Sequence, residues 1–276
     1  MLKSIMLVVD GSNAGVAAQN LAVKIAKEKK AQITGIGVLD ITWIVEPLPE
    51  PFVGTAYSVY GAEEIEVEHR HVSEALKKFA KKCSDAEVAF RYVEEKGSPA
   101  RIIEDLSHRH DLIVIGQTTE FHFELEKAND LTVKQVARDN PRPLLVVPEH
   151  ASKGDRILVA YDGSLQAARS LHMFLLLGLG LGKAVDIVTI HKKVEKATEI
   201  AQAAYDICLK HGLKSTVHAI DDGRSPAEII LEKIDEFKSG TIVMGAFSHP
   251  TIREVLFGSS TLDLIERCPI PLFIHH

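Results

Sequence analysis

The residues best suited to bind a ligand lie near the end of the chain, between Met244 and Ser260 (MGAFSHPTIREVLFGSS). A short apolar run before them predicts a buried strand, and the closing Gly258-Ser259-Ser260 precedes a helical pattern. Glycine lets backbone amides approach an anion closely, and a helix N-terminus offers unpaired N–H groups with a favourable dipole. The serine hydroxyls can donate to a phosphate or cap the helix, and the motif alone leaves both roles open.

An aspartate at the end of another apolar run provides a second candidate. Asp162 follows RILVAY and precedes Gly163-Ser164. The carboxyl ends of parallel strands are where doubly wound domains bind their ligands. A structural reading is equally available, because Asp162 or Ser164 could cap the helix that begins near Leu165. The two readings are compatible.

Four segments of the chain occur twice in the same order, which indicates duplication of a whole domain. The pairs are IMLVVDGS with RILVAYDGS, GSPA with RSPA, LIVIG with IVMG, and PLLVV with PLFI. Asp10 and Asp162 are 152 positions apart, whereas Pro99 and Pro226 are 127 apart. The first half therefore carries about 25 additional residues, which we place in Ile41–Gly61. We favour an ordered packed loop there over a lid or partner surface.

Each half alternates apolar runs with amphipathic helical patterns, which is typical of a parallel sheet covered on both faces. The predicted strands are 4–9, 32–39, 87–93, 111–115, 143–147, 156–161, 184–190, 215–220, 241–244 and 271–274. The predicted helices are 14–25, 65–79, 130–139, 165–178, 195–211, 226–238, 259–267 and one starting at Pro99. We expect an α/β protein of two tandem, five-stranded, doubly wound (Rossmann-like) domains, 1–150 and 154–276.

The two halves should lie close together. The linker from His150 to Asp155 spans at most about 20 Å. The last strand of each half, at 143–147 and 271–274, would expose unpaired backbone groups if it lay at a sheet edge. We expect these strands to pair within the chain in a pseudo-two-fold arrangement, and we expect any homodimer to use other surfaces.

Composition restricts the partners. The chain has 276 residues, 46% hydrophobic and 25% charged, with a net charge of −6 and a pI near 6.1. This indicates a soluble globular protein with no footprint for nucleic acid or an anionic membrane. The odd, scattered cysteines favour a reducing cytoplasm and buried thiols: Cys83, Cys208 and Cys268. The histidine clusters lack metal-site spacing and are expected on the surface: His69, His71, His108, His110, His275 and His276.

With both halves in view, nearly the whole chain resembles the universal stress protein family in its tandem form. The family pattern is a strand ending in Asp-Gly-Ser, then Gly-x2-Gly-x9-Gly-Ser, then a final apolar strand after proline. The second half matches it from Asp162 to Pro271, except that Ser248 replaces the second glycine. The resemblance implies an adenine-nucleotide site there: Ala160, Asp162, Gly163, His191, Lys192, Met244, Gly245, Ser248, Gly258, Ser259 and Ser260.

The first half keeps Gly116 but has Thr119 at the second glycine and Asn129-Asp130 at the Gly-Ser pair. Acidic residues in this corner repel phosphate, and Glu120 adds to them. We therefore expect any nucleotide in the second half only, and a structural or regulatory role for the first.

Two classes of function follow. The first is a stress-response or regulatory protein that binds ATP or another adenine nucleotide, with or without Mg²⁺. The alternative is an interaction protein that uses the same fold, with the 41–61 loop as a docking surface for an unknown protein. The sequence shows no P-loop and no nucleophile elbow, so we expect no enzyme, apart from the slow ATP hydrolysis that some family members show.

Overall fold

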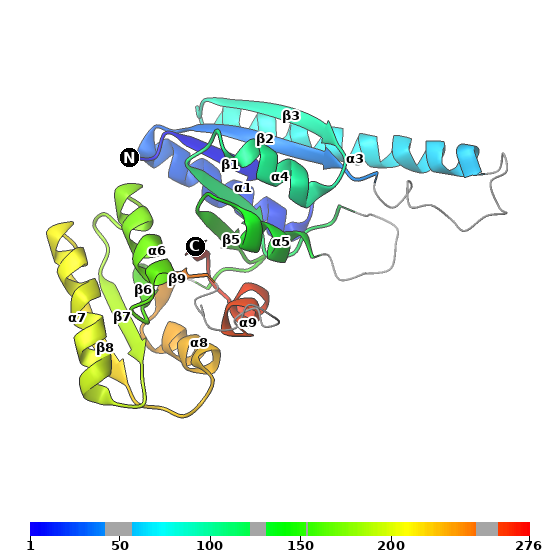
Figure 1. Cartoon of the computed structure of the whole chain (residues 1–276). Coiled ribbons are helices and arrows are strands. Elements are labelled where there is room, and N and C mark those ends of the chain that lie inside the picture. The colour runs from blue at the N-terminus through cyan, green and yellow to red at the C-terminus, as the bar shows by residue number, and fades with distance from the viewer. Residues whose placement is uncertain (42–56, 122–130, 153, 247–258) are drawn as a thin grey trace.

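The computed structural model describes residues 1–41, 57–121, 131–152, 154–246 and 259–276, with side chains described for all of them except residues 57–64, 259 and 260. Their strands form one ten-stranded sheet in the order β3-β2-β1-β4-β5-β10-β9-β6-β7-β8 (Figure 1). Each half contributes five parallel strands wound outward in both directions from its first strand, β1 or β6. The predicted doubly wound α/β fold is confirmed.

The elements fall close to the predicted ranges. The first half contains β1 (Ser4–Val8), α1 (Asn13–Lys29), β2 (Gln32–Leu39), α3 (Tyr57–Asp85), β3 (Phe90–Lys96), α4 (Pro99–Ser107), β4 (Leu112–Gly116), α5 (Thr132–Asp139) and β5 (Leu144–Val147). The second half contains β6 (Arg156–Ala160), α6 (Leu165–Leu176), β7 (Val185–Ile190), α7 (Val194–Lys210), β8 (Ser215–Ile220), α8 (Pro226–Glu236), β9 (Ser239–Gly245), α9 (Ser259–Arg267) and β10 (Leu272–His275).

The two halves join through their last strands. β10 pairs antiparallel with β5, and Phe273 lies opposite Leu145 at the centre of the pairing. The two strands thereby satisfy the backbone groups that either would expose at an edge. The expected pairing within the chain is confirmed, and it makes the two sheets continuous.

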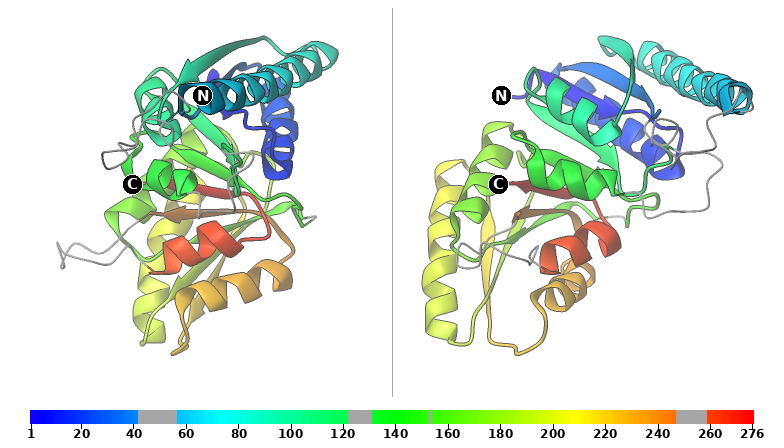
Figure 2. Two further views of the ribbon diagram at one scale, coloured as in Figure 1. Left: turned by 90° about the vertical axis from the view of Figure 1, so that its right-hand side faces the viewer. Right: turned by 45° about the vertical axis from the view of Figure 1, so that its right-hand side comes forward.

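Helices cover both faces of this sheet (Figure 2). One hydrophobic cluster lies between the sheet and α1, α3, α6 and α7, and it crosses the junction through Leu145 and Phe273. Phe273 meets Phe174 of α6 edge to face, with ring centroids 5.2 Å apart. A second cluster lies between the sheet and α4, α5, α8 and α9. The helices stay amphipathic because only one stripe of each faces the sheet.

The insertion in the first half is partly helical. α3 begins at Tyr57 and has 29 residues, whereas its counterpart α7 has 17. The expectation of a loop reaching to Gly61 is therefore wrong for its last residues, which extend the helix past the end of the sheet (Figure 1). Residues 42–56 lie outside the described part, so the choice between packed loop and lid stays open.

β3 lies three residues later than predicted. The chain leaves α3 through Glu87 in a left-handed conformation (φ 57°), and Val88 N–H closes the turn on Cys83 C=O. The strand that follows is an edge strand with exposed charges, Arg91 among them, so an apolar run does not mark it.

The burial of the cysteines agrees with the prediction, whereas that of two histidines does not. All three thiols are free and buried, as predicted, and burial raises the pKa of Cys268 to about 12. His110 is buried instead of solvated, and its Nδ1 lies 2.6 Å from Ser4 Oγ. His275 is half-buried, and burial lowers its pKa to about 4. His110 lies two residues before β4, and His275 is the last residue of β10, so burial at the ends of the sheet includes polar side chains.

No helix in the described ranges is both long and apolar enough to cross a membrane.

Candidate functional site

The candidate site lies where strand order reverses in the second half. β6 pairs with β7 on one side and β9 on the other, and Ala160 lies opposite Met244 in the β6–β9 pair. Helix α6, which follows β6, and helix α9, which follows β9, pack against opposite faces of the sheet. Such a reversal opens a crevice beyond the carboxyl ends of the strands, where open α/β sheets bind ligands.

Asp162 lies at this edge, in a tight turn between β6 and α6. Gly163 has φ 79°, a conformation that glycine adopts without strain. The exposed Asp162 accepts a hydrogen bond from Ser164 N–H at Oδ1, 2.9 Å away. Ser164 is the N-cap of α6, since its Oγ accepts from Ala167 N–H at 3.1 Å. Ser164 therefore fills the capping role, and the Asp162 carboxylate remains at the solvent-facing mouth of the turn.

Gly245 ends β9 beside the first turn of α6. A Cβ atom added to Gly245 would lie 2.4 Å from Ala167 N, closer than real contacts allow. The glycine thus lets α6 pack directly against the strand end. Close helix–strand packing is one known use of glycine in such motifs, so Gly245 has a structural reason to be glycine that is independent of any ligand.

The strand β7 brings His191 to the same edge. His191 N–H donates to Ile220 C=O, and its Nδ1 accepts from Lys193 N–H at 3.0 Å. This second hydrogen bond orients the imidazole ring just beyond the strand. The neighbouring Lys192 is exposed.

The structure therefore collects most of the expected site at one edge: Ala160, Asp162, Gly163, His191, Lys192, Met244 and Gly245. Helix α9 begins at Ser259, as predicted, but the side chains of Ser259 and Ser260 are not among those described. Ser248 and Gly258 lie outside the described residues. Their roles stay predictions.

The corresponding corner of the first half is built differently. Asp10 is 5% exposed and accepts from Ser12 N–H at Oδ1 (3.3 Å) and from Glu120 N–H at Oδ2 (2.9 Å). Burial raises the pKa of Asp10 to about 6, although these hydrogen bonds oppose the rise. The carboxylate that would face a ligand is thus turned inward and bound to its own chain.

A glycine in the first turn of α1 leaves room for this inward turn. A Cβ atom added to Gly15, in the first turn of α1, would lie 2.1 Å from Asp10 Oδ1. The corresponding position in the second half is Ala167. Sequence reasoning missed this pair, although the aligned repeats DGSNAG and DGSLQA display it.

Comparison with known proteins identifies the family. The protein-family model described as "Universal stress protein family" matches residues 1–148 and 154–276. The chain therefore belongs to this family and carries two tandem copies of its domain. The finer boundaries expected from the sequence, 1–150 and 154–276, stay a prediction.

The chain is 26% identical over 172 residues to Universal stress protein Slr1230 of Synechocystis. That match covers 62% of this chain and 59% of the relative. A universal stress protein of Archaeoglobus fulgidus has a similar fold over 99% of this chain and 97% of its own, with 21% identity and a TM-score of 0.71. A putative universal stress protein of Pseudomonas aeruginosa matches over 99% of this chain and 93% of its own, with 15% identity and a TM-score of 0.59.

Proposed function

We propose that the second half binds one adenine nucleotide, ATP or a relative of it, in a stress-response or regulatory role without robust catalysis. The observation that carries the proposal is the exposed Asp162 carboxylate at the β6–β9 reversal point. A carboxylate in this position of a doubly wound domain can accept hydrogen bonds from ribose hydroxyls.

The other parts of the crevice fit the same ligand. Ala160 and Gly163 are small and reach the surface at the strand end, which would leave room there for a flat base and a sugar. Helix α9 has nine residues and directs its N-terminal amides to the carboxyl edge of the sheet. These amides and the Gly258-Ser259-Ser260 motif would hold the phosphates, with Mg²⁺ as an optional companion of a triphosphate.

The first half supports the proposal by contrast. There the strand-end carboxylate is buried, and its Oδ2 already accepts from Glu120 N–H. A ribose would have to displace that hydrogen bond and the buried side chain before it could bind. We therefore propose one nucleotide per chain.

The test is calorimetric titration of the full chain with ATP, ADP and AMP, each with and without Mg²⁺. We expect a stoichiometry of one per chain for at least one nucleotide. Asp162→Asn should weaken binding by about tenfold or more, because hydrogen bonds to charged groups contribute about 1.5–3 kcal/mol. The matched variant Asp10→Asn should leave the affinity within about twofold, the ordinary spread between variants that lose no contact.

Three results would contradict the proposal. These are no binding of any of the three nucleotides, two sites per chain, or equal losses in Asp10→Asn and Asp162→Asn. Two further variants concern the motif itself. Gly258→Asp should abolish binding, and Ser248→Gly should leave affinity within a few fold, about 1 kcal/mol, if the Ser248 hydroxyl replaces a glycine contact.

A further inference from the structure

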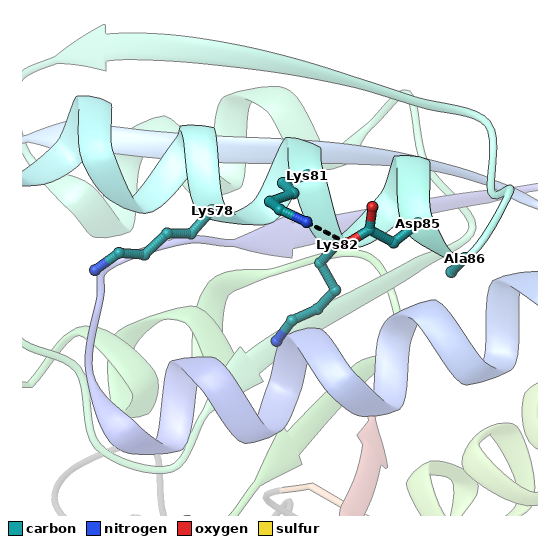
Figure 3. A pocket seen from close by; sticks show the side chains of 5 residues that line it. All are labelled: Lys78, Lys81, Lys82, Asp85 and Ala86. Atoms are coloured by element: carbon teal, nitrogen blue, oxygen red, sulfur yellow. Dashed lines mark hydrogen bonds and ion pairs between the residues drawn. The ribbon is translucent and has the colours of Figure 1, made fainter.

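A second surface feature, a groove lined by lysines, lies on the first half of the chain. A cavity of about 430 Å³ beside α1 is lined by four residues from the last turns of α3 and by the residue after it: Lys78, Lys81, Lys82, Asp85 and Ala86 (Figure 3). We call this the basic groove. The aliphatic stems of the lysines and the Ala86 methyl group supply its apolar surface, while three ammonium groups lie around it.

The charge of the basic groove is only partly balanced. Lys81 pairs with Asp85, with Nζ 2.7 Å from Oδ2. Lys82 reaches α1 and donates to the neutral Asn20 side chain at 2.7 Å, so its charge keeps no carboxylate partner among the described contacts. Burial lowers the pKa of Lys82, as expected for a cation held without an adjacent anion. The exposed Lys78 extends along α3, away from Lys82 (Figure 3), and forms no ion pair in the described part of the chain.

The surroundings strengthen the positive field. Residues 24–30 of α1 and its C-cap, together with residues 77–85 of α3, contain eight lysines and two carboxylates. This local excess of six positive charges stands in a protein whose net charge is −6. The two helices lie side by side, as the hydrogen bond between Lys82 and Asn20 requires.

The fold itself does not require these lysines. By the repeat, residues 176–182 and 202–210 correspond to the two segments, and Cys208 occupies the place of Cys83 as a buried thiol. The corresponding segments contain one lysine and one aspartate. These segments of the second half carry no net charge, although residues 177–182 form turns after α6 instead of a longer helix. The buried core that the two halves share is therefore built there without a lysine cluster.

We propose that the basic groove binds an acidic segment of a partner protein. Three ammonium groups beside apolar stems suit a short amphipathic segment that presents carboxylates and small apolar side chains together. Lysine is a point charge without the planar fork that reads phosphates and bases, and the groove has no arginine or aromatic side chain.

The probe for the test is a fluorescein-labelled helical peptide of about 16 residues, long enough to form a helix, with glutamate on one face and leucine and alanine on the other. Fluorescence anisotropy with the full chain should show binding that weakens as salt rises. The double variant Lys78→Gln, Lys82→Gln should bind about tenfold more weakly, and Lys24→Gln, Lys27→Gln on the exposed side of α1 should lose affinity as well. Lys210→Gln, at the corresponding end of α7, should change affinity less than about twofold.

Thermal unfolding of each variant separates lost binding from lost folding, and the α1 pair provides the test if the Lys82 variant is unstable. Equal affinity for a peptide with glutamine in place of every glutamate would overturn the proposal. The proposal would also be wrong if duplex DNA or phosphatidylserine vesicles bound more tightly than the peptide and the Lys78→Gln, Lys82→Gln variant abolished that binding. The groove would then serve another class of partner.

Discussion

The two halves of the chain share a fold and a turn but use their strand-end aspartates in opposite ways. Asp10 and Asp162 each follow the first strand of their half, and each precedes a glycine with positive φ, Gly11 or Gly163. Asp10 points inward and accepts from Glu120 N–H, while Asp162 stays exposed. The same motif therefore indicates a fold in both halves and a candidate site in only one of them.

The glycines at the ends of β4 and β9 show what the halves must keep. A Cβ atom on Gly116 would lie 2.7 Å from Gly15 N, and one on Gly245 would lie 2.4 Å from Ala167 N. Both strand ends press against the first turn of a helix. This requirement is independent of a ligand, which explains why the first half retains Gly116 although the rest of its phosphate motif has changed.

The largest effect should come from filling these contacts. Gly116→Ala and Gly245→Ala should each lower the free energy of unfolding by about 3 kcal/mol, because the new methyl group meets helix backbone that cannot turn aside. Chemical denaturation of the full chain measures both. Gly223→Ala is the control, since a Cβ atom there meets nothing within 4 Å. If only Gly245→Ala were damaging, the shared packing role would be wrong.

A smaller effect should appear in the pH dependence of stability. The pKa of Asp10 is raised to about 6, whereas an unfolded carboxyl titrates near 4. Between these values the native state holds a proton that the unfolded state has lost, so stability falls as pH rises and the penalty persists above pH 6. The expected loss is about 2–3 kcal/mol, and Asp10→Asn should remove it.

Denaturation at pH 4, 5, 6 and 8 checks this slope. The control is Asp162→Asn, which changes an exposed side chain and should shift stability by about 0.5 kcal/mol or less at every pH. A wild-type slope that survives in Asp10→Asn would show that another group causes it.

The periodic pattern and the repeat predicted the elements, the sheet and the β5–β10 pairing because these follow from apolar periodicity and the need to cover edges. The pattern failed where tertiary context decides. β3 is an edge strand with charged residues, so its start depends on the turn at Glu87. The full length of α3 was not predicted because its first residues, YSVYG, continue the aromatic segment 41–61 that we assigned to a loop.

The site could be predicted only as a set of residues at one sheet edge. The space for an inward aspartate differs between the halves at the fifth residue after it, which is Gly15 after Asp10 and Ala167 after Asp162. A match to the Asp-Gly-Ser motif does not include that position. The burial of His110 was likewise not predictable from a surface-like HRH run, since its partner Ser4 lies 106 residues away.

Of these substitutions we expect Gly15→Ala to have the smallest effect on stability. It should, however, change the direction of the Asp10 carboxylate. The new methyl group would occupy the place of Asp10 Oδ1, so the carboxylate must turn out toward solvent, as Asp162 does. Its pKa should then fall from about 6 toward the ordinary carboxyl range, which carbon-detected NMR titration of Asp10 can follow. Relief of the buried charge and the better helix propensity of alanine offset the lost hydrogen bond to Glu120 N–H, so stability at pH 7 should change by no more than about 1 kcal/mol. Ala167→Gly is the reciprocal control and frees the same space beside Asp162. If Asp10 still titrated near 6 in Gly15→Ala, a single methyl group would not be what separates the two corners, and the loop after β4 would have to hold the carboxylate inward by itself.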